Sequence, residues 1–390
     1  MEYFIDENGN RHYTAGQIAS DGQGVFYRAK GEGVFICDSS AIHGQKHKYI
    51  DAKLLPLESV ENIIMPCAYL KEPYAGYIML VPGDFSPLTE IMNHSHNKRE
   101  FYAKTGGLKR RVLLMAELAK TLHMLHSVPC MYGPVMPHRM FIPTAANKTE
   151  LFLLYSVNMT ATMPFTAQEE SNRYAAPEAK NGVATIHSDV YSFGRLAHDL
   201  FTMEGTFGET LDNSTRLRET LTLAMSDDPY RRPVMPDLHK CFLRVSDLLV
   251  SCKNCHRDFM YLDNKCPFCK KRLPKILKAR IYDRVENKKV ERGQKVFELY
   301  PGIQQCFWNY HTEHVLYRDS AEPRIGCMTG ISSSKKLHFI VKNLMNKDLK
   351  ANGKLLAPGQ TSAITLPCES IKISFLLHAA VYRHIEMVFE

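Results

Sequence analysis

The sequence predicts a multidomain α+β protein in which four regions of different character follow one another. Short apolar runs separated by glycines dominate 1–83, and apolar residues recur at helical spacing within 84–250. Four cysteines gather in 251–274, and β-branched residues alternate with turns in 275–390. With 390 residues, the chain is long enough for several domains.

The first region reads as antiparallel strands. "GVFYRAK" (24–30) and "GVFICD" (33–38) alternate around a Gly-Glu-Gly turn, which predicts a hairpin. "YAGYIMLVPGD" (74–84) is a further apolar strand that ends at a Pro-Gly break.

The second region is predicted to be mainly helical. "GLKRRVLLMAELAKTLHMLHS" (107–127) places apolar residues on one face of a long helix. Three more helices are expected at 188–202, 215–226 and 236–252. The segment "MYGPVMPHRMFIP" (131–143) reads as a loop that follows the long helix.

Five motifs of these two regions occur in a recognisable order. They are "DGQGVFYR" (21–28), the loop 131–143, "YAAPE" (174–178), "SDVYSFG" (188–194) and "SDDPYRRPVM" (226–235). Each motif alone is weakly specific, since "SDVYSFG" would also suit any helix with a Ser or Asp cap. Their joint order resembles that of a protein kinase.

The resemblance implies a bilobal kinase-like fold, with an N-lobe at 1–83 and a helical C-lobe at 84–250. The segment "GYIMLVPGDFSPLTEIM" (76–92) is similar to one bacterial group, the kinases of tellurite-resistance-type phosphorylation triads. That similarity implies two protein partners, a metal-dependent protein phosphatase and a von Willebrand factor A-type protein.

The positions that would carry phosphoryl transfer are degenerate. The reaction needs a lysine on the third strand, a catalytic-loop aspartate, and an asparagine and an aspartate that hold Mg²⁺. In the kinase alignment these four positions are occupied by Cys37, Pro134, Arg139 and Tyr155. We expect no catalytic residue here, and we expect Arg139 to point into the cleft as an internal substitute for the metal.

The glycine-rich loop that would bind nucleotide is also degenerate. Of the residues in this loop, Gly22 and Gly24 remain, while Asp21 takes a glycine position and would repel a triphosphate. ATP and Mg²⁺ binding is therefore disfavoured.

The residues that would support the kinase-like scaffold are present. The resemblance implies that Glu178 pairs with Arg232 and that Asp189 accepts hydrogen bonds from backbone N–H groups of the loop 131–143. Supporting residues without reactive ones are typical of a pseudokinase, so the sequence predicts a catalytically dead regulator or scaffold in signalling.

One alternative is an atypical, active ATP-dependent protein kinase. In this alternative Lys30, with Lys46 or Lys48, would reach the cleft, and His138 would act as a base. We interpret His138 instead as an exposed loop histidine.

The cysteine unit has the spacing of a structural zinc site, Cys-x2-Cys, ten residues, then Cys-x2-Cys. Two such turns place four thiolates tetrahedrally around Zn²⁺, and a site closed by four cysteines is structural. The expected ligands of this zinc ribbon are Cys252, Cys255, Cys266 and Cys269. The aromatic residues Phe259, Tyr261 and Phe268 are expected to fill its small core.

The basic charge of the chain, +8 overall, is concentrated at 252–295, which alone sums to +9. A nucleic-acid-binding function for the basic zinc ribbon is therefore a second alternative. Protein contact is favoured over nucleic acid, because the aromatics here are assigned to the core rather than to base stacking.

The last region, 275–390, is predicted to be a small all-β sandwich for protein interaction. Residues 337–375 resemble the second half of a forkhead-associated fold, although the elements that would read a phosphopeptide are not evident. Two segments, 288–307 and 353–375, share a Gly-Gln turn followed by strands, which suggests either a weak two-fold repeat or a chance similarity of two hairpins.

The chain is expected to be cytoplasmic. Its start, "MEYFIDENGN", is acidic and unlike a signal peptide, and no apolar run reaches the length of a membrane helix. Cysteines in that compartment indicate metal binding or free thiols before disulfides.

Overall fold

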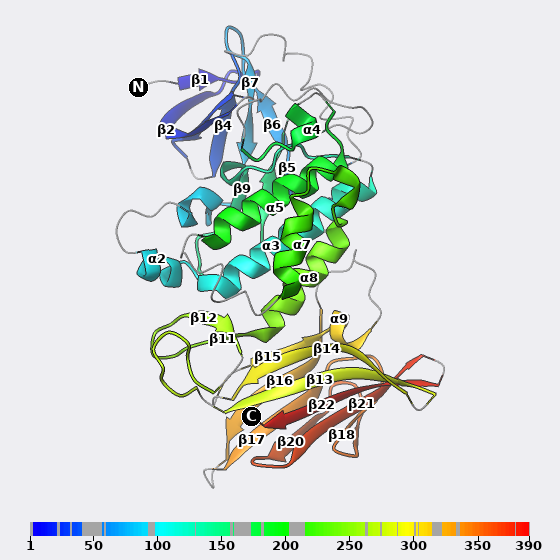
Figure 1. The fold of residues 1–390 in the computed structure, drawn as a ribbon. Helices are drawn as coiled ribbons and strands as arrows, with labels where there is room; N and C mark the ends of the chain where they lie inside the picture. The colour runs from blue at the N-terminus through cyan, green and yellow to red at the C-terminus, as the bar shows by residue number, and fades with distance from the viewer. Residues whose placement is uncertain are drawn as a thin grey trace. The chain divides into compact units, whose positions relative to one another are not determined.

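The computed structural model divides the chain into two compact units, Met1–Leu243 (unit 1) and Arg244–Glu390 (unit 2). Both units combine helices with antiparallel sheets, so the chain is a mixed α/β protein (Figure 1). The described residues are 3–21, 24–31, 33–40, 57, 60–92, 98–128, 130–156, 159, 173–180, 183–202, 215–261, 264–273, 275–286, 288–299, 302, 304–313, 322–332, 336–378 and 380–389.

Unit 1 opens with a six-stranded antiparallel sheet in the order β1-β2-β3-β4-β7-β6. Its strands are β1 (Tyr3–Ile5), β2 (Arg11–Asp21), β3 (Gly24–Ala29), β4 (Val34–Asp38), β7 (Gly76–Leu80) and β6 (Pro66–Tyr69). The expected hairpin is present, since Val25 pairs with Asp38 and Arg28 with Phe35. Alternate side chains, such as Phe4, Ile36 and Ile78, fill one buried cluster.

A second sheet of unit 1 joins segments that are far apart in the sequence. Its order is β5-β10-β9-β8, and β5 and β10 run parallel. The strands are β5 (Ile63–Ile64), β10 (Phe152–Leu154), β9 (Met140–Pro143) and β8 (Phe85–Pro87). This sheet fixes the end of the loop 131–143, because the loop runs into β9 and β9 pairs with β10.

The helices of unit 1 lie together, mostly below the six-stranded sheet in Figure 1, and α5 contacts both α3 and α7. The longest is α3 (Gly107–Ser127), which has the bounds that its apolar spacing predicts. The others are α2 (Lys98–Lys104), α4 (Pro177–Lys180), α5 (Ile186–Thr202), α7 (Thr215–Ala224) and α8 (Met235–Leu248), with short 3-10 turns η2 (Leu88–Ile91), η3 (Pro137–Arg139) and η4 (Pro229–Arg231). Among the described helices, none is both long and apolar enough to cross a membrane.

The chain enters unit 2 through the end of α8. The helix predicted at 236–252 stops at Leu248, and the next residues form β11 (Leu249–Ser251). β11 pairs with β12 (Asp258–Met260) in a two-stranded sheet that carries the cysteine unit. The extended conformation prevails here because Val250 must face the core of that unit rather than continue the helix.

The rest of unit 2 consists of two antiparallel sheets, drawn yellow to red in Figure 1. The larger has the order β14-β13-β22-β21-β18-β19 and the smaller β15-β16-β17-β20. Their strands are β13 (Ile276–Val285), β14 (Lys288–Glu298), β15 (Gln304–Trp308), β16 (Pro323–Ile331), β17 (Leu337–Asn343), β18 (Leu349–Ala351), β19 (Lys354–Leu356), β20 (Thr361–Thr365), β21 (Ser370–His378) and β22 (Val381–Phe389).

Side chains from both sheets share one buried core, as in a sandwich. Phe297 and Phe307, for example, come from different sheets and lie 4.9 Å apart between ring centroids. A short helix, α9 (Asn309–Thr312), follows β15.

The two-fold repeat suggested by the sequence is wrong. Gly359 and Gln360 do lie in a turn between β19 and β20, but Gly293 and Gln294 lie inside β14. The pairing register between β13 and β14 shifts beside Gly293, so this glycine marks a bulge rather than a turn.

Candidate functional sites

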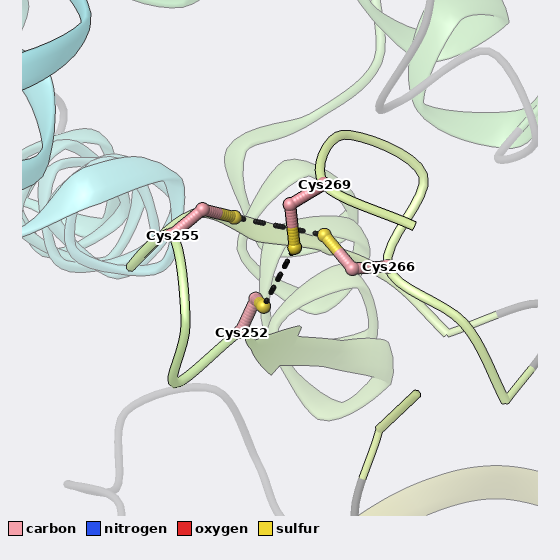
Figure 2. Close-up of side chains that lie close together, drawn as sticks. All are labelled: Cys252, Cys255, Cys266 and Cys269. Atoms are coloured by element: carbon pink, nitrogen blue, oxygen red, sulfur yellow. Dashed lines mark hydrogen bonds between the residues drawn. The ribbon is translucent and has the colours of Figure 1, made fainter. Parts of the chain in front are cut away.

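The four cysteines of the predicted zinc site lie together in unit 2 (Figure 2). The Sγ atoms of Cys252 and Cys269 are 3.6 Å apart, as are those of Cys255 and Cys266, and all four lie within 4.8 Å of one another. A tetrahedral site with Zn–S distances of about 2.3 Å separates its sulfurs by about 3.8 Å. The four thiols therefore lie close enough to bind one zinc ion, consistent with a zinc ribbon.

Each Cys-x-x-Cys turn, which we call a knuckle, is closed by the same pair of backbone hydrogen bonds. In the first knuckle the Cys252 N–H donates to the Arg257 carbonyl at 2.8 Å, and the His256 N–H donates to the Cys252 carbonyl at 2.7 Å. In the second knuckle the matching bonds, Cys266 N–H to Lys271 and Lys270 N–H to Cys266, measure 2.9 and 3.0 Å. The two knuckles are thus copies of one turn.

The residue after the second cysteine of each knuckle adopts a left-handed backbone conformation. His256 has φ 55° and Lys270 has φ 59°. Glycine adopts this conformation at the lowest cost, yet neither knuckle has one there.

The core of the cysteine unit is shared with the larger sheet of unit 2. Phe259 is buried, and Tyr261 and Phe268 pack against the same cluster, so the predicted role of these aromatics is confirmed. Ile276 from β13 and Val296 from β14 complete the cluster. Metal binding and the packing of this sheet edge are therefore coupled.

The donor set suits zinc rather than a harder cation. Four thiols and no carboxylate favour a soft or borderline metal bound as thiolates. Burial raises the pKa of Cys266, whereas a backbone N–H from Lys271 lowers the pKa of Cys269. With four protein ligands the site has no open position, so its chemistry is structural.

In unit 1 the structure connects two positions that the sequence analysis treated separately, Asp21 and Arg139. Arg139 Nε and Nη2 donate to Asp21 Oδ2 at 3.0 and 2.8 Å, and the guanidinium is completely buried. Nη1 donates to the Tyr155 carbonyl at 3.4 Å, and the Cζ atom lies 4.6 Å from the centre of the Phe26 ring. Arg139 thus points into the interior of unit 1 rather than into solvent, and Asp21 at the end of β2 neutralises it.

His138 shares the same carboxylate oxygen. Its Nε2 lies 2.7 Å from Asp21 Oδ2, and its side chain is 10% exposed. The interpretation of His138 as an exposed loop histidine is therefore wrong, because the ion pair between η3 and β2 draws it inward.

The other three positions of the kinase alignment are also buried. Burial raises the pKa of the Cys37 thiol to about 12, so the thiol is neutral. Pro134 and Tyr155 are buried, and the Tyr155 ring lies against Tyr77 with centroids 5.5 Å apart. Burial would lower the pKa of Arg139, but Asp21 and nearby phenols raise it, so the guanidinium stays charged.

Of the glycine-rich segment, Gly24 begins β3 and Gly22 lies outside the described residues. A Cβ at Gly24 would come 2.4 Å from the Asp38 carbonyl oxygen. Gly24 is therefore required by strand packing.

Glu178 and Arg232 form a bidentate ion pair. Arg232 Nη1 and Nη2 donate to the two carboxylate oxygens at 2.6 and 2.9 Å, and the Ser188 hydroxyl donates to the same group at 2.8 Å. Burial opposes the charged carboxylate, yet these hydrogen bonds hold the pKa of Glu178 below its usual value. The pair joins α4, α5 and the end of η4.

Asp189 on α5 organises the start of the loop 131–143. Its Oδ2 and Oδ1 accept the N–H groups of Tyr132 and Gly133 at 2.7 and 2.9 Å, and Oδ2 also lies 2.9 Å from His126 Nε2. Gly133 adopts φ 91°, which a larger residue would strain. The loop is therefore fixed from α5 rather than by its own sequence.

A buried charged cluster in unit 2 was missed by the sequence analysis. Asp247 Oδ2 lies 2.7 Å from His311 Nε2, and Lys295 Nζ donates to Oδ1 at 2.5 Å. The Trp308 N–H points at His311 Nδ1, so this ring is neutral and donates through Nε2. These residues lie up to 64 positions apart in the sequence, and no spacing signal connects them.

Comparisons with known proteins assign no family to the chain. A scan against protein-family models finds no match for the chain. A search of curated proteins also finds no match.

Proposed function

We propose that unit 1 is a catalytically dead, protein kinase-like domain and that the chain is a scaffold or regulator acting through protein contacts. The proposal is supported by the buried cluster of Arg139, Asp21 and His138. In an active kinase the corresponding region must hold Mg²⁺ and triphosphate, which need carboxylate ligands and free space. Here an arginine and its carboxylate partner already satisfy each other.

The supporting contacts favour a kinase-like identity. The Glu178–Arg232 pair and the backbone contacts of Asp189 are those expected from the motif order of 174–178, 188–194 and 226–235. Contacts that maintain the scaffold are present, while the four positions for chemistry hold no carboxylate, amide or lysine. This combination favours a fold retained for binding rather than for catalysis.

The partners follow from the resemblance. We infer a metal-dependent protein phosphatase and a von Willebrand factor A-type protein as binding partners, with the β-sandwich as an additional docking surface. The sandwich resembles a forkhead-associated domain in its turn at Asn352 and Gly353 before the last strands. Its part in the scaffold is protein interaction.

Nucleotide binding is the direct test. The purified chain is heated with ATP and Mg²⁺ at millimolar concentration, beside an active kinase as the positive control. A ligand that binds the native state raises the melting temperature, so we expect a shift for the control and none for this chain. Mg²⁺-dependent phosphotransfer that Arg139→Ala or Asp21→Ala abolishes would show that the proposal is wrong.

A further inference from the structure

The described residues between 252 and 280 form a strongly positive surface. They include nine lysines and arginines and a single acid, Asp258, which accepts a hydrogen bond from Ser251. Several of the cations are exposed on or beside the two knuckles. We define the knuckle surface as the exposed residues Lys253, His256, Lys265, Lys270, Lys271, Arg272 and Lys275.

Two members of this surface occupy costly backbone positions. His256 and Lys270 stand at equivalent places in the two knuckles, both left-handed and both exposed. The hydrogen bonds that close the knuckles use backbone atoms, so the turn does not require either side chain. A strained residue that the fold does not need is an indication of function.

The knuckle surface offers cations without apolar anchors. Phe259 is buried, and Arg257 lies over the face of the Phe268 ring at 4.3 Å. Among the described residues of 252–273, no large apolar side chain is exposed. Protein interfaces depend on buried aromatic or aliphatic anchors, and single-stranded nucleic acids are held by stacking on free aromatic faces. Neither is available here.

The cations are also held on a fixed framework. The cysteine unit packs on β13 and β14 through Ile276 and Val296. On β13, Lys278 and Arg280 add two cations that lie two residues apart on one strand face, about 6.7 Å along the strand, and Glu386 of β22 stands opposite Arg280. Because the backbone beneath these cations is fixed, binding to an array of negative charges would order only their side chains.

We propose that the knuckle surface binds the phosphate backbone of duplex DNA. Charge complementarity supports this partner, since a duplex presents closely spaced phosphates whose counterions are released by lysine and arginine. Duplex RNA is recognised with additional contacts to 2′-hydroxyls, whereas this surface is mainly cationic. The proposal does not depend on the proposed function of unit 1.

The test uses the full, zinc-loaded chain and a fluorescent, mixed-sequence DNA duplex. Anisotropy titrations over a series of salt concentrations should give binding that weakens steeply with salt. Lys270→Gly should lower the slope of log K against log salt by about 1 and weaken binding about fivefold at 0.15 M salt, whatever the DNA sequence. Lys270→Arg keeps the cation, so its salt slope and its affinity should equal those of the parent chain.

Glu286→Gly is the matched control. Glu286 is also exposed and left-handed, with φ 46°, in the turn between β13 and β14. This variant relieves the same backbone strain without removing a cation, so DNA binding should not weaken. Zinc content, measured for all three variants, should stay equal to that of the parent chain.

Three results would overturn the proposal. The first is no binding to the DNA duplex at low salt, and the second is binding that Lys270→Gly leaves unchanged. The third is tighter binding to an RNA duplex, to single-stranded DNA or to polyglutamate, each titrated in parallel under the same conditions.

Discussion

The cysteine unit of unit 2 and the loop 131–143 of unit 1 show opposite relations between sequence and chemistry. In the cysteine unit every position that metal binding needs is filled, and the four thiols meet in the structure. In the loop, the positions that the proposed kinase-like fold would use for phosphoryl transfer hold Pro134 and Arg139 instead. The loop is nevertheless well supported, because Asp189 and Asp21 fix it from other elements.

Under the proposed kinase-like fold, the loop would be a site that has lost its chemistry but kept its supporting contacts. In unit 2 a bound metal would stabilise the cysteine unit, which buries little apolar surface by itself. In unit 1 the ion pair of Asp21 and Arg139 supplies both charges from the chain itself. Four predictions test this contrast, from the largest expected effect to the smallest.

The largest effect is expected from removing a cysteine ligand. Cys252→Ser should lower the zinc content from one ion per chain and disorder the knuckles. Structural zinc contributes about 10–16 kcal/mol of apparent binding free energy in zinc-finger peptides. Metal analysis and amide hydrogen exchange of 249–273 measure both effects. Cys368→Ser, which changes a thiol on the sandwich, serves as the control, and full zinc in Cys252→Ser would contradict the assignment.

The second prediction concerns the buried ion pair of unit 1. Arg139→Met leaves the Asp21 carboxylate, whose side chain is 6% exposed, without its main partner. We expect a loss of about 3–5 kcal/mol in the free energy of unfolding. The double variant Asp21→Leu/Arg139→Met should recover most of that loss, since apolar replacements of a buried pair are often neutral. Denaturant unfolding measures the free energy of unfolding of the single and the double variant. An equal loss in the two would refute this account.

The third prediction is the pH dependence of unit 2. Burial alone would raise the pKa of Asp247, but His311 and Lys295 hold it at about 2, below its ordinary 3.8. Burial lowers the pKa of His311 below 6.5. Both groups bind protons more readily in the unfolded chain, so each adds to the free energy of unfolding at higher pH. The His311 contribution is lost as pH falls below about 6.5, and the Asp247 contribution between about 4 and 2.

The size of the Asp247 contribution follows from its pKa. A depression of this magnitude corresponds to about 2 kcal/mol at neutral pH. Denaturant unfolding gives the free energy of unfolding of the parent chain and of Asp247→Asn at a series of pH values from 7 downward. The difference between the two should become smaller as the pH falls. A difference that stays constant down to pH 2 would show that Asp247 is not held ionised.

The smallest effect is expected at the left-handed residues of the knuckles. Lys270→Gly and His256→Gly should each raise the free energy of unfolding by about 0.5–1 kcal/mol. The relief of left-handed strain exceeds the added entropy that glycine gives the unfolded chain. Thermal unfolding of the zinc-loaded protein measures the change. A lower melting temperature in both variants would mean that these side chains stabilise the knuckles.

Local patterns predicted local structure well. The bounds of α3 follow from apolar spacing alone, and the cysteine spacing gave the metal ligands because both knuckles are short turns. The helix expected at 236–252 ended early, since Val250 is drawn into the core of the cysteine unit. The turn expected at Gly293 proved to be a bulge, because β13 supplies a continuous partner on that side.

The sequence by itself determined the four cysteines that could bind a metal, the positive charge around them and the residue types at Cys37, Pro134, Arg139 and Tyr155. These properties depend on residue type and short spacing. Only the tertiary structure decided that Asp21 neutralises Arg139 across 118 residues and that Asp247 meets His311. Such contacts depend on how sheets and helices pack. Residues throughout the core contribute to the free energy of that packing, so no single motif determines it.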